Sequence, residues 1–138
     1  MTTQIHQRRD LAANQLETAV GLFISGHDRF SVITLAGAAD AILSQLVKNK
    51  GERTFIEALI EGAENEKLAC SDMGKHVNDV LFINALKHMD KDDDGSVVMD
   101  VEECALASIL VAMANFVTLN GRGTDFVEAF FCLGQIEP

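Results

Sequence analysis

The sequence predicts an all-α protein, a compact antiparallel bundle of about five helices. Apolar residues recur at helical spacing along most of the 138-residue chain, and residues that start or stop helices bound these segments. Only the stretch "SVVM" has the composition of a strand. The chain is 48% hydrophobic and contains one proline, so we expect a single folded domain over residues 1–138.

Two helices are predicted in the first fifty residues. The apolar positions of the first are Ile5, Ala12, Leu16, Ala19 and Phe23. Gly26 follows them as a C-terminal cap, and Ser31 is placed to cap the second helix. Asp40 is the only charged residue between Val32 and Val47. We therefore expect the second helix to be central, and a buried Asp40 to need a partner.

The third and fifth predicted helices each begin with a capping box, in which a polar side chain and an acid three residues later satisfy N–H groups. The boxes are Thr54 with Glu57 and Asp100 with Glu103. A fourth helix is predicted over residues 73–89, the fifth extends to Gly121, and Thr124 can cap a short last helix. The apolar segments at 31–47 and 101–119 are expected to form the centre of the bundle.

The chain is acidic, with a net charge of -10. This charge argues against a large non-specific surface for nucleic acid, which needs concentrated lysine and arginine. The basic residues gather at two places: Arg8 and Arg9, then Lys48, Lys50 and Arg53. They could form a local basic patch, but solvated helix ends are the favoured interpretation.

The N-terminal segment, the lengths of the apolar runs and the cysteines bear on the localisation and the redox state of the protein. The N-terminal "MTTQIHQRRDLAANQ" lacks the apolar core of a secretory signal. No uninterrupted apolar run reaches the ~18 residues that a membrane span requires. We therefore expect a cytoplasmic protein without a membrane partner. Cys70, Cys104 and Cys132 are widely spaced in apolar surroundings, so reduced buried thiols are expected rather than disulfides or a metal site.

An acidic stretch after the fourth predicted helix is similar to a calcium-binding loop. The first, third, fifth and sixth positions of an EF-hand loop are matched by Asp90, Asp92, Asp94 and Gly95. The twelfth position, which needs a bidentate glutamate, is Val101, and Glu102 comes one residue late. One residue is a rotation of about 100° on a helix, so Glu102 would point away from the loop centre. A plain acidic turn is therefore preferred, and calcium binding stays an alternative.

Three segments carry a resemblance to a known family. In order and spacing, "RDLAANQLETAVGLF", "SVITLAGAADAIL" and "FINALKHMDKDDDG" resemble the HEPN-type helical domains of bacteria, closest to a small uncharacterised group with an N-x-x-K-H motif. The similarity runs from about Arg9 to Gly121. It implies an antiparallel helical bundle, often dimeric. In many relatives it also implies a metal-independent ribonuclease site shared across the dimer.

The resemblance assigns candidate catalytic residues, but the sequence departs from the family motif at one position. Relatives combine an arginine, a polar residue and a histidine; Asn84 and His88 match the last two, whereas Ile83 stands in place of the arginine. His88 could move the proton of a 2′-hydroxyl, with Asn84 one helical turn before it. Lys87 is a weaker, point-charge substitute for the arginine. Alternatively, Asn84 and His88 form a structural pair, with Lys87 or His88 as the partner of Asp40.

The expected function is that of a catalytically degenerate HEPN-like module, which binds a nucleotide, RNA or a protein partner, for example in a defence or toxin–antitoxin context. We expect a homodimer and no cofactor. Two alternatives remain. One is a metal-independent ribonuclease that uses His88. The other is an EF-hand-like calcium-binding protein that uses Asp90, Asp92 and Asp94.

Overall fold

The computed structural model of the protein describes residues 2–65, 95–96, 98–121 and 127–128. Four α-helices are delimited within these residues: α1 (Arg8–Ile24), α2 (Arg29–Asn49), α3 (Phe55–Asn65) and α6 (Val101–Phe116). A π-helical turn, η1 (Val117–Gly121), continues α6. The described residues contain no strand, so the all-α prediction is confirmed for this part of the chain. The helix predicted at 73–89 and the cap predicted at Thr124 lie outside it.

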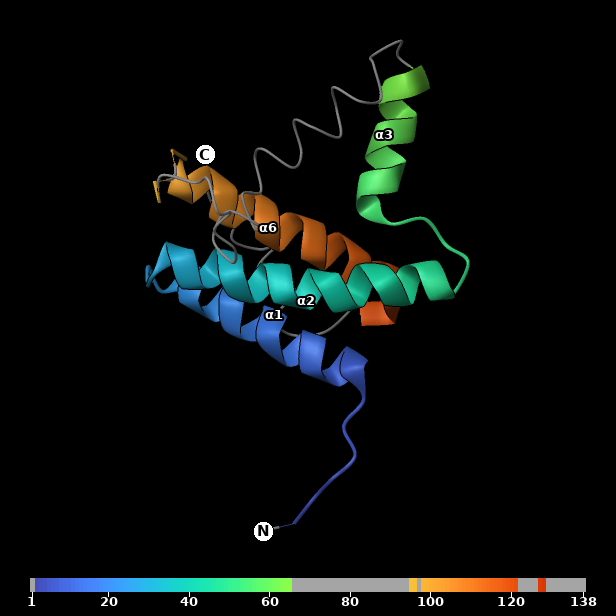
Figure 1. The fold of residues 1–138 in the computed structure, drawn as a ribbon, viewed down its shortest axis with the longest axis horizontal. Coiled ribbons are helices and arrows are strands. Elements are labelled where there is room, and N and C mark those ends of the chain that lie inside the picture. Colours follow the sequence, from blue (N-terminus) through green and yellow to red (C-terminus); the bar gives the residue numbers. More distant parts are fainter. Residues whose placement is uncertain (1, 66–94, 97, 122–126, 129–138) are drawn as a thin grey trace.

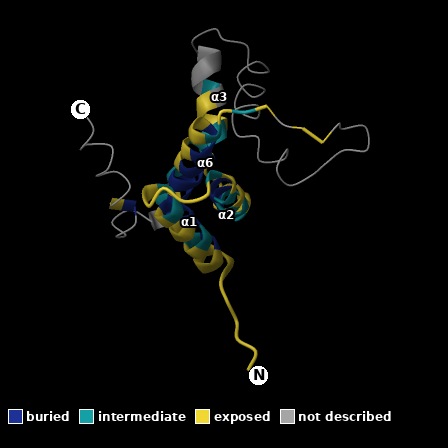
Figure 2. Cartoon of the chain, turned by 90° about the vertical axis from the view of Figure 1, so that its left-hand side faces the viewer, coloured by how far each residue is buried: buried dark blue, intermediate teal, exposed yellow. Residues whose placement is uncertain are grey.

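The helices α1, α2 and α6 pack side by side, with α2 in contact with both of the others (Figure 1). The buried residues gather where these three helices meet (Figure 2). The largest buried apolar side chains there belong to Leu16, Val20, Val32, Ile33, Leu43, Val47, Ile109 and Met113. The predicted central position of the second helix is therefore confirmed. Ile5 is 94% exposed and precedes α1, so its predicted place on the buried face is wrong.

The directions of the helices correct the expectation of a uniformly antiparallel bundle. α1 and α2 are antiparallel, but α2 and α6 run in the same direction (Figure 1). Arg29 at the start of α2 lies 2.7 Å from Glu102 at the start of α6. Further along the same two helices, Asp40 is bonded to Asn115. A parallel pair needs a crossover connection, and α3 belongs to the segment that makes it.

The helix ends confirm most of the predicted caps. Gly26 follows α1 with φ 78°, a left-handed conformation that glycine adopts readily. The N–H groups of Glu57 and Glu103 donate to Thr54 Oγ1 (3.2 Å) and Asp100 Oδ1 (3.1 Å). These bonds confirm Thr54 and Asp100 as N-caps of α3 and α6.

The predicted cap of α2 is wrong by three residues. α2 begins at Arg29, and its N-cap is Asp28, whose Oδ1 accepts from the N–H of Phe30 at 3.2 Å. The Ser31 hydroxyl donates to Asp28 Oδ2 at 2.6 Å. A carboxylate can accept both bonds at once, so Ser31 becomes a donor to the cap instead of the cap itself.

Two segments are long and apolar enough to cross a membrane by length and composition alone, α2 and Val101–Leu119. Buried helices of soluble proteins meet the same criterion, because a helix in the middle of a bundle is apolar around most of its circumference. The cytoplasmic location stays a prediction.

Candidate functional site

The candidate catalytic residues that the resemblance assigns, and the candidate calcium ligands that the loop spacing assigns, fall outside the described part of the chain. These are the candidate catalytic residues Asn84, Lys87 and His88, and the candidate calcium ligands Asp90, Asp92 and Asp94. Their roles stay predictions. Asp40, the supporting residue, is described, and the site can be built from it and from the surfaces around it.

Asp40 is half-buried on α2 and has a partner on α6. The side chain of Asn115 donates from Nδ2 to Asp40 Oδ1 at 2.7 Å. Burial raises the pKa of the Asp40 carboxyl above its ordinary value, and the hydrogen bond from Asn115 partly opposes this rise. The prediction that Asp40 has a polar partner is confirmed. The predicted partners Lys87 and His88 lie outside the described residues, and sequence reasoning overlooked Asn115.

Asn115 also holds the beginning of α3. Its Oδ1 accepts from the N–H of Phe55 at 2.9 Å, and its side chain is 1% exposed. Thr54, the N-cap of α3, directly precedes Phe55 in the sequence and is also buried. One amide therefore joins α2, α6 and the start of α3. We interpret this Asp40–Asn115–Phe55 junction as structural, because both bonds fix the positions of helices.

Two of the three acids that follow the acidic stretch, Asp100 and Glu102, have partners outside it. Arg29 Nε donates to Glu102 Oε1 at 2.7 Å, and Asp100 caps α6. Gly95 has φ 85°, which suits both a simple turn and the sixth position of a calcium loop. No group of three histidine, cysteine or acidic side chains that could hold a metal occurs within the described ranges. The acid that would have to close a calcium loop already has a cationic partner.

Cys104 is a free, buried thiol on α6. Burial raises the pKa of this thiol, and the negative charges of Glu103 and Asp100 add to the rise. A raised pKa leaves little thiolate at neutral pH, so Cys104 is a poor nucleophile. The predicted burial of this cysteine is confirmed, and its reduced state stays a prediction.

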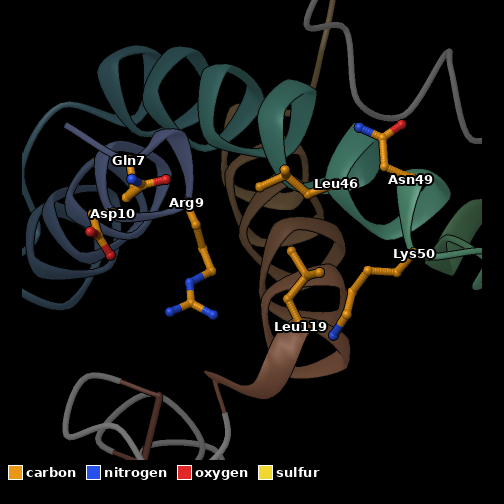
Figure 3. Close-up of a pocket in the computed structure, with 7 residues that line it drawn as sticks. All are labelled: Gln7, Arg9, Asp10, Leu46, Asn49, Lys50 and Leu119. Carbon is orange, nitrogen blue, oxygen red and sulfur yellow. The ribbon is translucent and has the colours of Figure 1, made fainter. Parts of the chain in front are cut away.

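A hollow of about 490 Å³ lies at the end of the bundle where α1 begins and α2 ends (Figure 3). Its lining residues are Gln7, Arg9, Asp10, Leu46, Asn49, Lys50 and Leu119. The side chains of Arg9 and Lys50 extend into it from α1 and from the end of α2, with Leu46 and Leu119 between them (Figure 3). The hollow thus has cationic sides and an apolar floor.

The hollow is lined by one residue from each of the two basic clusters of the sequence, Arg9 and Lys50. Because α1 and α2 are antiparallel, the first turn of α1 lies near the last turn of α2, and Arg9 and Lys50 line the same hollow. Their neighbours Arg8 and Lys48 are not part of the lining. Lys48 Nζ instead lies 3.9 Å from Glu57 Oε1. Arg9 and Lys50 are both exposed at helix ends, so the interpretation as solvated helix ends holds for them as well.

Comparison with known proteins finds no match to this chain among protein-family models, curated proteins or solved structures. The resemblance to HEPN-type domains thus rests on the quoted segments alone, and the function is argued from the junction and the helix arrangement.

Proposed function

We propose that the chain is a catalytically degenerate, HEPN-like helical module that binds a protein partner through α3, the partner being a second copy of the chain. The observation that carries this proposal is the position of α3. It leaves the end of the bundle and extends away from it, rather than along α1, α2 and α6 (Figure 1).

The side chains of α3 are arranged as an interaction helix requires. Phe55, Ile56 and Leu59 share one apolar stripe, at positions i, i+1 and i+4. Phe55 and Ile56 are only half-buried, and Leu59 is 37% exposed. Among the described elements, α3 contacts α6. An amphipathic helix with a partly exposed apolar stripe gains stability by packing against another helix, as helix-in-groove partners do.

The start of α3 is held in a defined orientation. Asn115 binds the N–H of Phe55, and Thr54 caps the first turn. Two ion pairs, Lys48–Glu57 and Arg53–Glu61, connect the preceding loop and α2 to α3. A helix that is already oriented loses less conformational entropy when its partner binds. This arrangement favours an interface helix that is already formed and oriented before the partner binds, rather than a segment that folds upon binding.

The sequence motif supports a binding module rather than a nuclease. Ile83 replaces the arginine that would clamp the phosphorane. Asp40, the half-buried acid of the apolar second helix, is bonded to Asn115 in a junction of helices. Most soluble oligomers consist of copies of one chain, and a two-fold dimer is their commonest closed form, so a second copy is the partner we propose for the apolar stripe of α3.

Light scattering of the full chain at micromolar concentration tests this proposal. We expect a dimer for the wild type and a monomer for Leu59→Ser, because the substitution places a hydroxyl on the apolar stripe. Ile24→Ser is the matched control, since Ile24 is 44% exposed at the far end of α1. Ile24→Ser should stay dimeric. A monomeric wild type, or equal dissociation of both variants, would overturn the role of α3.

A further inference from the structure

We propose that the Asp40–Asn115–Phe55 junction is a pH-sensitive switch that controls how firmly α3 is held. The ionised carboxylate of Asp40 locks the Asn115 amide in the orientation that binds the start of α3, and protonation of Asp40 unlocks it. The inference concerns the regulation of the interface helix, so its consequence for assembly rests on the function proposed above. The switch itself lies within a single chain.

The Asn115 side chain uses both ends of its amide. It is 1% exposed, its Nδ2 donates to Asp40 Oδ1 at 2.7 Å, and its Oδ1 accepts from the N–H of Phe55 at 2.9 Å. If the amide rotated by half a turn about its last side-chain bond, its oxygen would face Asp40 and its NH₂ group would face Phe55. The orientation of one amide therefore decides whether α3 is bonded to α6 at this point.

The ionised carboxylate permits one orientation of the amide. A carboxylate accepts hydrogen bonds and cannot donate them, whereas a backbone N–H donates and cannot accept. With Asp40 ionised, the rotated amide would place two acceptors together at Asp40 and two donors together at Phe55. Both bonds are partly buried, so these unfavourable contacts would be costly. Asn115 is thus locked in the orientation that binds Phe55.

Protonation of Asp40 removes this selection. A protonated carboxyl carries an O–H donor as well as an acceptor, so it can bond either end of the Asn115 amide. The rotated amide then keeps its bond to Asp40 but leaves the N–H of Phe55 without its acceptor. Asp40 no longer opposes the rotated orientation, and the bond that holds α3 is present for only part of the time.

The bond to Phe55 matters because α3 has few other attachments. Among the described elements, α3 packs mainly against α6, and it extends away from the bundle (Figure 1). Its ion pairs, Lys48–Glu57 and Arg53–Glu61, join exposed side chains, and such pairs contribute little. The N–H of Phe55 is one of the groups at a helix start that have no partner within the helix. Its partly buried bond to Asn115 therefore has a large share in the attachment of α3.

Asp40 can change its charge without a charged neighbour. Burial raises the pKa of its carboxyl, and the hydrogen bond from Asn115 partly opposes this rise. Titratable and charged side chains also occur on the helices around it, and none of those in the described residues is a cause of the shift. On α1, α3 and α6 these described side chains are Arg8, Arg9, Asp10, Glu17, Glu57, Glu61, Glu102, Glu103 and Cys104.

Acidification has two effects of opposite sign. As the pH falls through the folded pKa of Asp40, the fold as a whole gains the stability that the raised pKa supplies. The attachment of α3 weakens over the same pH range, because the Asn115 amide is unlocked. Linkage also works in the other direction: a partner that fixes α3 favours the locked amide, and so lowers the pKa of Asp40. A purely structural junction would show only the first effect.

Nuclear magnetic resonance of the full chain between about pH 3 and about pH 8 tests the switch. We expect the Phe55 amide and the Asp40 carboxyl carbon to titrate with the same midpoint. Below it, the protection of the Phe55 amide from hydrogen exchange should fall by about twofold to tenfold, the worth of one hydrogen bond. In Asp40→Asn, whose amide can bond either end of Asn115 at every pH, the Phe55 titration should be absent. A Phe55 amide that does not titrate in the wild type would overturn the switch.

Two further variants serve as controls. Glu57→Gln removes an acid of α3 that lies two residues from Phe55, and it should keep the Phe55 titration. A titration that persists in Asp40→Asn and disappears in Glu57→Gln would assign the effect to α3 itself and contradict the switch. Leu59→Ser should titrate like the wild type, because the junction lies within one chain and does not depend on assembly.

Light scattering over a dilution series tests the consequence for assembly. Below the midpoint, the dimer Kd of the wild type should rise by about twofold to tenfold, whereas that of Asp40→Asn should not change with pH. A wild type that is monomeric at every pH would refute the proposed function, and the Phe55 titration would still decide the switch. A dimer Kd that is independent of pH while Phe55 titrates would overturn the regulatory role.

Discussion

Asp40 and Asn115 lie 75 positions apart in the chain, yet their side chains share a hydrogen bond of 2.7 Å. Each is a polar residue within an otherwise apolar stretch of helix, and each lies on one of the two parallel helices, α2 and α6. Because Asn115 also accepts from the N–H of Phe55, the pair ties the bundle to α3. The energetics of this contact can be tested directly.

The first prediction concerns the charge of Asp40. Burial raises its folded pKa, so the fold favours the protonated carboxyl. The stabilisation that comes from the raised pKa of Asp40 is fully present below the pKa that this carboxyl has in the unfolded chain. It is lost as the pH rises through the pKa of the carboxyl in the folded protein. Asp40→Asn keeps an acceptor for Asn115 and removes the charge. We expect this variant to be at least as stable as the wild type at pH 7. Its stability should also lack the fall with rising pH that Asp40 causes in the wild type.

Urea denaturation between pH 3 and pH 8 measures the effect. Asp40→Leu serves as the control, because it removes both the charge and the acceptor. We expect Asp40→Leu to be less stable than Asp40→Asn, by about 1–3 kcal/mol, since the buried Nδ2 of Asn115 loses its partner. An Asp40→Asn variant with the same pH dependence as the wild type would show that Asp40 does not titrate as stated.

The second prediction concerns Asn115. Asn115→Ala removes the donor to Asp40 and the acceptor for Phe55, so we expect the free energy of unfolding to fall by about 2–4 kcal/mol, from the loss of two partly buried bonds and the creation of a small cavity. Part of the loss should disappear in the double variant Asp40→Asn/Asn115→Ala, because the uncompensated charge is then absent. If the stability changes of the two single variants simply add up in the double variant, Asp40 and Asn115 act independently. Thermal unfolding provides the measurement.

Local patterns predicted the helix ends and the core better than the directions of the helices. The caps at Thr54 and Asp100 and the glycine turn at Gly26 depend on neighbouring residues, which the sequence contains. Asp28 was overlooked because Ser31 lies next to the apolar run, although a carboxylate two residues before Phe30 is the stronger acceptor. The parallel course of α2 and α6 depends on the crossover between them, which no local pattern specifies.

The candidate sites were predictable only in part. The need of Asp40 for a partner followed from its position in an apolar helix. Asn115 could have been found by the same argument, since it is an amide within the apolar segment 101–119. The hollow could not have been found in this way. It lies where the antiparallel packing of α1 and α2 brings the beginning of one helix near the end of the other, and these segments are distant in the sequence.

The third prediction concerns Arg29, which connects the ends of three helices. Its guanidinium binds Glu102, donates from Nη1 to the carbonyl of Phe23 at 2.9 Å, and lies 4.4 Å from the centre of the Phe23 ring. Arg29→Ala should lower stability by about 1–3 kcal/mol, because all of these contacts are lost. Glu102→Gln should have an effect below about 1 kcal/mol, because Glu102 is largely exposed. Equal losses would assign the effect to the ion pair alone.

The same residues bear on the calcium alternative. Since Glu102 is bound to Arg29 and stands one residue late for a loop of the EF-hand type, we expect no calcium site of micromolar affinity or tighter. Calorimetric titration of the wild type with calcium measures this. A tight site that Glu102→Gln abolishes would restore the calcium hypothesis, with Asp90, Asp92 and Asp94 as ligands.

The last prediction separates a degenerate module from a working ribonuclease. If His88 has a structural role, His88→Ala should lower the melting temperature by several degrees, since loss of a buried hydrogen-bonding partner costs about 1–3 kcal/mol. We also expect no cleavage of single-stranded RNA by the wild type in EDTA, because Ile83 stands where the arginine would stabilise the transition state. His27→Ala is the control, since His27 is exposed and its removal should leave the melting temperature unchanged. Cleavage in EDTA that His88→Ala abolishes at unchanged stability would instead identify a metal-independent ribonuclease. A catalytic histidine supplies proton transfer without supporting the fold.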